Sequence, residues 1–252
     1  MSWRGVLVAL FFYALFLGGF ALGSLWSRPP VVVAAMLGNE PAAENSILVL
    51  AKKNKAEQQD PQAVVYCTHT SEEYCGQKRK NGVPGGVLSA AAALAEELEA
   101  CGVKTLLLDE VFDAPDWNYA YANSLAAVEK VKKQYPDIEL FIDVHRDSEV
   151  PGLDTNFSDG SGSYAKMMMI IGSDANLPHP DWKKNKKFAE KVNAAVEAAK
   201  PGLMRDPRIY NGRYNQHIGN KAFLVEVGST ANSVEQAQNS ARILAGAIAS
   251  SL

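Results

Sequence analysis

Two of the four histidines in this chain stand where they could bind a metal ion. His69 is followed by Glu72, and a histidine nitrogen and a carboxylate oxygen at this spacing can face one ion from a tight turn. Zinc accepts this combination of nitrogen and oxygen ligands readily. Alone, the spacing equally describes a surface histidine that caps a turn, but His145 supplies a second histidine after a separate apolar run. We therefore predict that His69, Glu72 and His145 bind zinc.

A further residue, Glu226, is the candidate catalytic base. Two neutral histidines and one carboxylate leave a Zn²⁺ ion with a net charge of about +1, which lowers the pKa of bound water from about 15.7 towards about 7. A second carboxylate must then take the proton and pass it to the leaving amine. Glu226 interrupts an otherwise apolar run, where an unpaired buried charge would cost several kcal/mol. The alternative is a glutamate on an edge strand that faces water.

An alternation of apolar runs and helical segments predicts the elements that position these residues. Strands are predicted at residues 63–68, 103–108, 138–144, 166–171 and 222–227, and helices at residues 86–101, 119–134, 181–199 and 233–250. Strands that are apolar on both faces and alternate with helices imply an α/β fold of three layers, with helices on both faces of a mostly parallel, twisted sheet. Ligands collect beyond the carboxyl ends of strands in such sheets, and His69, His145 and Glu226 lie at or near such ends.

The N-terminal residues 1–27 are predicted to be a transmembrane anchor. Residues 5–26 carry no charge and, at about 1.5 Å per residue, would reach roughly 33 Å, enough to cross a hydrocarbon core of about 30 Å. Trp3 and Trp26 flank the run, as indoles at a membrane–water interface often do. A cleaved signal peptide is the alternative, but the run is longer than the roughly 7–15 residues of a signal peptide's apolar core.

The rest of the chain is predicted to form a tether at residues 28–60 and one globular domain at residues 61–252. The tether region contains adjacent prolines and a polar stretch, with a possible short strand at residues 46–50.

Composition restricts the function further. The net charge of −3 argues against a nucleic-acid-binding protein, which normally has a basic excess. The cysteines, Cys67, Cys75 and Cys101, are too few for a disulfide scaffold, and their spacing matches no zinc-binding CxxC pattern. Metal binding is therefore expected to depend on histidines and carboxylates.

Separated segments, in order along the chain, resemble the stage II sporulation protein P family. They are residues 68–74 (THTSEEY), 142–147 (IDVHRD), 212–216 (GRYNQ) and 224–228 (LVEVG). That family consists of zinc-dependent N-acetylmuramoyl-L-alanine amidases, so the resemblance implies peptidoglycan as substrate, cleaved between the lactyl group of muramic acid and L-alanine. Family members often carry a histidine where this chain has Cys67, so Cys67 could be a rival thiolate ligand beside His69.

The resemblance also implies roles, a location and partners. His69, Glu72 and His145 would be the zinc ligands, and Glu226 would be catalytic. The chain would be a single-pass protein of the cell membrane with its catalytic domain outside the cytoplasm. It would act beside a lytic transglycosylase and an integral membrane partner during spore engulfment.

Arginines and the remaining histidines suggest how such a substrate could be held. A peptide stem carries carboxylates, and Arg213, in a loop rich in glycine and asparagine before the strand of Glu226, is our candidate for substrate binding. His217 follows the same loop and is a candidate to line the cleft, whereas His179, between two prolines, is expected at the surface.

The aspartates on either side of His145 are candidates for a supporting role. Asp143 or Asp147 could orient this ligand through a hydrogen bond, and the sequence does not choose between them. Arg146 is expected to pair with one of the same two aspartates.

Two alternative functions share these residues. A zinc carboxypeptidase or endopeptidase acting on wall peptides would use the same HxxE pair, distant histidine and glutamate base. A non-catalytic, anchored wall-binding module would have lost part of the site, although all the predicted groups are present.

Overall fold

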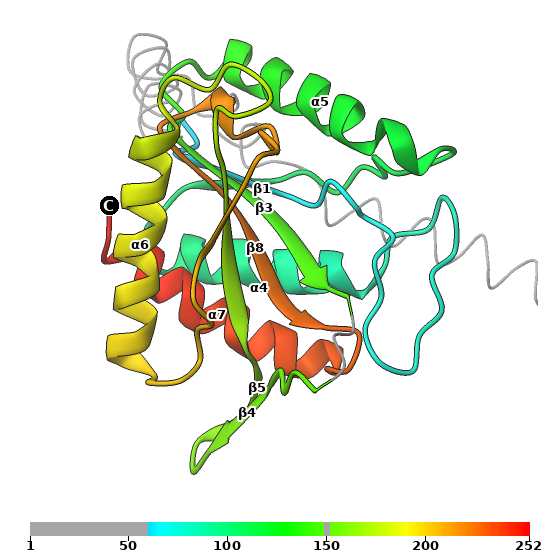
Figure 1. The fold of residues 1–252 in the computed structure, drawn as a ribbon, viewed down its shortest axis with the longest axis vertical. Helices are drawn as coiled ribbons and strands as arrows, with labels where there is room; N and C mark the ends of the chain where they lie inside the picture. The colour runs from blue at the N-terminus through cyan, green and yellow to red at the C-terminus, as the bar shows by residue number, and fades with distance from the viewer. Residues whose placement is uncertain (1–59, 149–151) are drawn as a thin grey trace, which may run out of the picture. The chain divides into compact units, whose positions relative to one another are not determined.

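The computed structural model describes residues 60–148 and 152–252 (Figure 1). The predicted anchor, nearly all of the predicted tether and the possible strand at residues 46–50 lie outside these ranges. Among the helices of the described ranges, none has both the length and the apolar character of a membrane span.

The described residues form a mixed, mostly parallel sheet of six strands in the order β2-β1-β3-β8-β6-β7. The parallel strands β2, β1, β3 and β8 confirm the predicted architecture around the site, whereas β6 runs antiparallel to β8 and β7 follows the direction of β6. The strands are β1 (Ala63–Tyr66), β2 (Thr105–Leu107), β3 (Leu140–Asp147), β6 (Met167–Gly172), β7 (Arg208–Tyr210) and β8 (Lys221–Ser229).

A separate hairpin and two short helical turns were not predicted. The hairpin pairs β4 (Asn156–Asp159) with β5 (Gly162–Ala165) and extends from the domain at the bottom of Figure 1. The 3₁₀ turns η1 (Trp117–Tyr119) and η2 (Gln216–Ile218) lie in connections that, as shown below, border the site.

The helices begin and end almost where the sequence predicts. They are α4 (Gly86–Ala100), α5 (Ala120–Gln134), α6 (Trp182–Ala199) and α7 (Val234–Ala249). Local signals explain two of the boundaries. Gly102 follows α4 with a φ of 85°, a conformation that glycine adopts at little cost, and Ser233 and Gln236 form a capping box at the start of α7.

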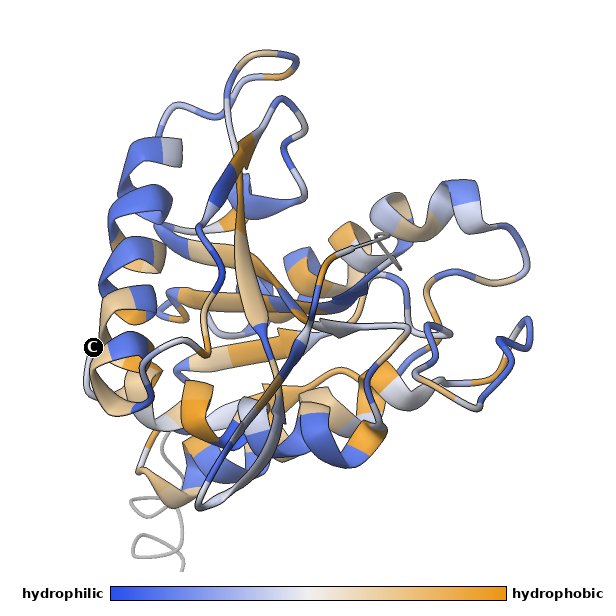
Figure 2. Cartoon of the chain, turned by 60° about the horizontal axis from the view of Figure 1, so that its bottom comes forward, coloured by the Kyte–Doolittle hydropathy of each residue, from blue (hydrophilic) through white to orange (hydrophobic). Residues whose placement is uncertain are grey.

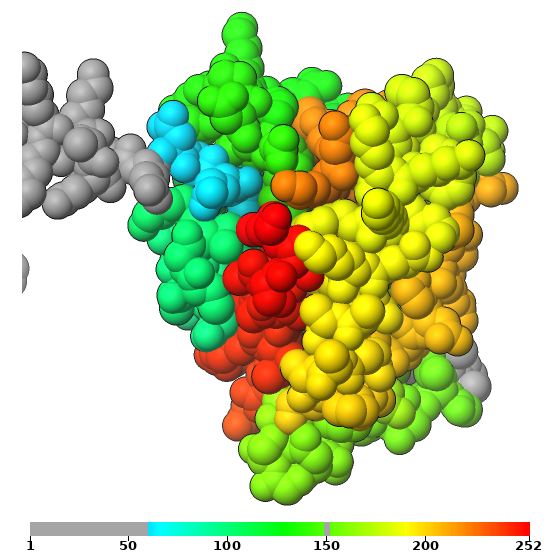
Figure 3. All heavy atoms as spheres, turned by 90° about the vertical axis from the view of Figure 1, so that its left-hand side faces the viewer, coloured from blue at the N-terminus to red at the C-terminus, as the bar shows by residue number. Residues whose placement is uncertain are grey.

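Helices cover the two faces of the sheet unequally. The main core packs α4, α6 and α7 against one face, and their apolar sides turn towards the strands while polar sides face outwards (Figure 2). Helices α6 and α7 also contact each other, as the side view shows (Figure 3). On the opposite face, α5 packs against β1, β2 and β3, where its Val128 meets Val64 and Phe141.

The remaining part of that second face is covered by a loop. Here Met168 and Ile170 of β6 and Leu224 of β8 pack together, and the residue that packs against them is Tyr214. The prediction of helices on both faces is confirmed, and the half of the second face without a helix is where the functional candidates lie.

Candidate metal centre

The predicted ligands and the predicted base line one cavity of about 450 Å³ on the part of the sheet that α5 leaves open. His69 and Glu72 reach it from the turn after β1, His145 from β3 and Glu226 from β8. Aromatic side chains form much of the remaining wall: Trp117, Tyr121, Tyr210 and Tyr214.

The turn after β1 is closed by hydrogen bonds within a few residues. The backbone N–H of Glu72 donates to the carbonyl of His69 at 3.0 Å, and the hydroxyl of Thr70 donates to the carbonyl of Cys67 at 2.7 Å. These bonds fix the relative positions of His69 and Glu72, so that both side chains reach the same cavity.

The start of α4 holds this turn from behind. The backbone N–H of Gly85 donates to the carbonyl of Thr70 at 2.8 Å, and Glu73 accepts a hydrogen bond from the N–H of Gly86 at 2.7 Å. A Cβ at position 85 would lie 2.1 Å from the carbonyl oxygen of Glu72. Only glycine permits this contact between the helix start and the ligand turn.

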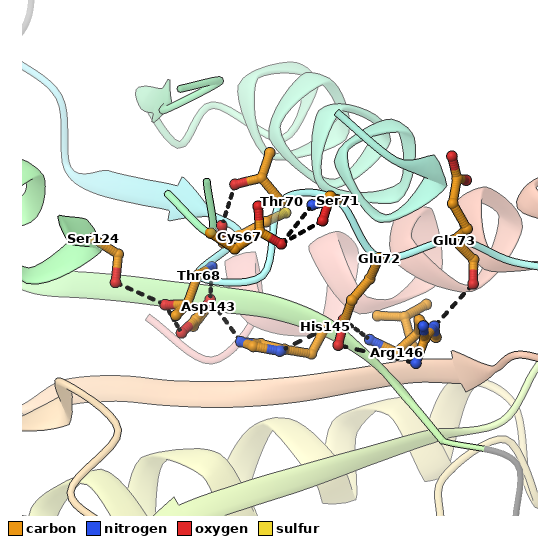
Figure 4. A network of polar contacts seen from close by, with 12 residues as sticks. Cys67, Thr68, Thr70, Ser71, Glu72, Glu73, Ser124, Asp143, His145 and Arg146 are labelled. Atoms are coloured by element: carbon orange, nitrogen blue, oxygen red, sulfur yellow. Dashed lines mark hydrogen bonds and ion pairs between the residues drawn. The ribbon is translucent and has the colours of Figure 1, made fainter. Parts of the chain in front are cut away.

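Asp143 orients His145 (Figure 4). This buried carboxylate accepts hydrogen bonds from the N–H of Thr68 at 2.8 Å and from its hydroxyl at 2.6 Å. Its Oδ1 lies 3.0 Å from Nε2 of His145, so the other ring nitrogen, Nδ1, turns towards Glu72. Of the two aspartates considered from the sequence, the structure selects Asp143, because Asp147 pairs with Arg205 at 2.8 Å.

Arg146 contacts the ligand turn instead of the aspartates. Its backbone N–H donates to Oε2 of Glu72 at 3.1 Å, and its Nε donates to the carbonyl of Glu73 at 2.8 Å. The expected pairing of Arg146 with Asp143 or Asp147 is therefore wrong. The arginine instead holds the Glu72 carboxylate in place from the side of β3.

His69 is held by stacking. Its ring lies parallel to that of Trp117, with centroids 3.7 Å apart and planes 2° apart, and the guanidinium of Arg79 covers the Trp117 ring at 4.3 Å. The Nδ1 atom of His69 is buried and has no hydrogen-bond partner among the described residues. A buried nitrogen without a partner is what a metal ligand presents before binding.

Glu226 lies in the middle of the sheet, opposite His145 in the register of β3 and β8. The alternative of an edge-strand glutamate facing water is wrong, because β8 runs between β3 and β6. Burial raises the pKa of Glu226 to about 7. The charge of His145 acts in the opposite direction and lowers this pKa, whereas the neighbouring Glu72 carboxylate raises it. Its Oε2 atom is buried without a partner in the described part of the chain.

The electrostatics of the histidines suit a cation. Burial and the charge of His145 lower the pKa of His69 to about 4, which leaves its nitrogen lone pair free at neutral pH. Burial alone would lower the pKa of His145 too, but Asp143 and then Glu72 outweigh it and raise the pKa to about 10. The negative potential that favours a proton on His145 equally favours a metal ion there.

The nitrogen and oxygen atoms of His69, Glu72 and His145 are of the kinds that zinc binds, and some of the distances between them suit a zinc ion. Nδ1 of His145 lies 3.6 Å from Oε2 of Glu72, close to the separation of about 3.3 Å between ligands of a tetrahedral zinc ion. The ring centroids of His69 and His145 are 5.2 Å apart. Across residues 60–148 and 152–252, however, no three histidine, cysteine or acidic side chains already stand in an arrangement that would hold an ion.

Comparison with known proteins identifies the family. A sequence model described as Stage II sporulation protein P (SpoIIP) matches residues 35–249. The chain belongs to the stage II sporulation protein P family. Stage II sporulation protein P of Bacillus subtilis (strain 168) is 25% identical over 199 residues, which cover 72% of this chain and 48% of that protein. The chain thus spans about half the length of this curated relative.

Solved structures with a similar arrangement of elements include two amidases and a peptidase. N-acetylmuramoyl-L-alanine amidase from Clostridium difficile 630 aligns with a TM-score of 0.46 and 15% identity over 77% of this chain and 95% of its own. N-acetylmuramoyl-L-alanine amidase AmiC2 of Nostoc punctiforme aligns with a TM-score of 0.42 and 16% identity, over 77% of this chain and 96% of its own. A metallo-carboxypeptidase from Burkholderia cenocepacia aligns with a TM-score of 0.48 and 10% identity, over 78% of this chain and 58% of its own.

Cys67 is not a rival ligand in this member of the stage II sporulation protein P family. Its side chain belongs to the core on the α4 side of the sheet and is fully buried. Burial also raises the pKa of the Cys67 thiol well above its ordinary value, which disfavours the thiolate that a metal requires.

Arg213 lies beside the metal cavity and not in it. It lines a neighbouring cavity of about 260 Å³, and its Nη1 donates to the carbonyl of Pro178, outside that lining, at 3.2 Å. His217 is not among the residues that line the metal cavity. The expectation that His179 lies at the surface is wrong, since it is 1% exposed and contacts Asn185 at 3.1 Å.

The aromatic wall is the part of the site that sequence reasoning missed. Trp117 and Tyr121 come from the connection between β2 and β3, Tyr210 ends β7, and Tyr214 lies in the loop between β7 and β8. An available signal was the concentration of aromatic residues at 117–121, at the start of a predicted helix.

Proposed function

We propose that this chain is a zinc-dependent hydrolase that cleaves the amide bond between N-acetylmuramic acid and L-alanine in peptidoglycan. The observation that carries the proposal is the meeting of His69, Glu72, His145 and Glu226 in one cavity, where buried donor atoms of His69 and Glu226 lack partners among the described residues. Membership in the stage II sporulation protein P family supports the cell wall as the substrate.

Each residue has a distinct role in this proposal. Nδ1 of His69, the carboxylate of Glu72 and Nδ1 of His145 would hold the zinc ion, with Asp143 fixing the imidazole of His145. When bound, zinc would polarise the substrate carbonyl and lower the pKa of a water molecule.

Glu226 would accept the proton of the attacking water and pass it to the nitrogen of L-alanine as that amine leaves. Without a metal ion, burial raises the pKa of Glu226 to about 7, and a bound Zn²⁺ would lower that pKa and so favour the carboxylate that accepts the proton.

Purified peptidoglycan should release a new amine on L-alanine when it is digested with the protein, and a chelator should stop the reaction until zinc is added back. The reason is that hydrolysis of each lactyl–alanine bond frees one such amine. Labelling of new amines, followed by mass spectrometry of the fragments, measures the outcome. New amines on other stem residues would identify a peptidase, and wall binding without any new amine would identify a binding module.

We also propose that residues 1–27 anchor the chain in the cell membrane, with the catalytic domain outside the cytoplasm. The support is the uncharged run at residues 5–26. The full-length chain should therefore sediment with membranes, and a chain without residues 1–27 should be soluble and active. Recovery of a shortened, soluble product from cells that express the full-length chain would instead show a cleaved signal peptide.

Family membership supports a role for the protein in sporulation. We propose that it acts in spore engulfment beside a lytic transglycosylase and an integral membrane partner. Such partners suit the chemistry, since cleavage of glycan strands and removal of their peptides are complementary steps in dismantling the wall.

A further inference from the structure

Two tyrosines separate the metal cavity from the neighbouring cavity that contains Arg213. Tyr121 and Tyr214 line both cavities, and their ring centroids are 5.8 Å apart. A substrate that occupies both cavities must therefore pass these two rings.

The second cavity offers a cation to a ligand. Within the described residues, Arg213 forms no ion pair, and its one hydrogen bond goes to the carbonyl of Pro178. The guanidinium thus retains N–H groups that could bind a carboxylate bidentately. The chemistry of this cavity is that of an anion site with aromatic walls.

Tyr214 is held between the cavities by an unusual backbone conformation. Tyr214 and the next residue, Asn215, have φ angles of 48° and 56°, a region that residues other than glycine rarely occupy. Each such residue costs of order 1 kcal/mol or more and persists only where the surroundings enforce it.

Hydrogen bonds on both sides enforce that conformation. Asn215 donates to the carbonyl of Tyr121 at 2.8 Å and to the hydroxyl of Ser124 at 3.1 Å. Gln216 accepts from the N–H of Gly172 and donates to the carbonyl of Ile170, both at 2.9 Å. The turn is therefore fixed to α5 on one side and to β6 on the other, and Tyr214 is positioned rather than mobile.

We propose that Tyr214 is a specificity-determining residue, which directs the first free carboxylate of the peptide stem after L-alanine into the cavity of Arg213. The scissile amide then lies among His69, Glu72, His145 and Glu226. The preferred substrate is an acidic stem, and a stem amidated at that carboxyl is a poorer one. This inference rests on the proposed amidase function.

The test compares two N-acetylmuramoyl tripeptides that differ only in whether the α-carboxyl of the D-glutamyl residue is free or amidated. The full-length chain, kept in detergent, should hydrolyse the free acid with a kcat/KM higher by about tenfold, mainly through KM. Arg213→Gln and Tyr214→Ala should each abolish that preference. Tyr214→Leu serves as a second variant if Tyr214→Ala does not fold, and Arg242→Gln, an exposed arginine on α7, is the matched charge control that should keep the preference.

The outcomes separate this inference from the proposed function. Equal hydrolysis of both substrates by the unmodified chain overturns the inference and leaves the amidase function standing. A preference that is lost in Arg213→Gln but kept in both Tyr214 variants overturns the role of Tyr214. Hydrolysis of neither substrate, in the presence of zinc, overturns the proposed function and this inference with it.

Discussion

Glu226→Gln should lower turnover by roughly 10²–10⁴-fold while leaving zinc content and folding unchanged. The amide cannot accept the proton of the attacking water, but it nearly matches the carboxylate in size. Burial raises the pKa of this carboxyl to about 7, so the site disfavours its charged form and the neutral amide should not destabilise the fold. Zinc content by metal analysis and hydrolysis rates from released amines measure the two parts of this result.

Glu72→Gln is the matched substitution, since both glutamates line the same cavity. It replaces a charged ligand by a neutral one, so zinc affinity itself should fall. Loss of zinc from Glu226→Gln with retention in Glu72→Gln would mean that the roles of the two glutamates are reversed.

His145→Ala should remove both zinc and activity, and His69→Ala should do the same. Each substitution deletes one nitrogen ligand, and the remaining pair of ligands is too few for a stable zinc site. Zinc content after dialysis and the rate of amine release at saturating zinc measure the effect. His217→Ala is the control, because this histidine does not line the metal cavity. Stoichiometric zinc with full activity in either ligand variant would reject the metal assignment.

The helices were predictable because their signals are local. Apolar periodicity, the glycine after α4 and the serine before α7 all lie within a few residues of the boundaries that they set. The direction of β6 depends instead on the connections. Where a helix joins two strands, as α4 and α5 do, the strands are parallel, whereas the described residues between β3 and β6 form a hairpin but no helix. A parallel neighbour requires a long crossover, usually a helix, so the absence of a predicted helix there was a usable signal.

The site was predictable as far as it depends on the parallel strands. The carboxyl ends of β1, β3 and β8 are adjacent in the sheet, which brings His69, His145 and Glu226 into one cavity. Asp143 and Asp147 lie the same even number of residues from His145, so strand alternation does not distinguish them. The register of β3 against β8 shifts between His145 and Asp147, which distinguishes the two aspartates, and no sequence pattern predicts this shift.

The position of Tyr214 in the aromatic wall lies beyond such reasoning for a related reason. Tyr214 faces the cavity because two left-handed residues turn the loop, and hydrogen bonds to α5 and β6 hold it there. These contacts join segments far apart in the sequence, so they are specified by the folded domain and not by the loop alone.

The contact of Gly85 with the carbonyl of Glu72 has a consequence for how this protein can vary in length. Loops usually accept insertions and deletions, because their backbone is exposed and few contacts depend on it. Residues 69–73 are a loop by position, yet an added or lost residue there would exchange Glu72, which faces the cavity, with Glu73, which caps α4. Within this connection, length variation is expected instead at the exposed residues 80–83, which follow Arg79 and precede Gly85.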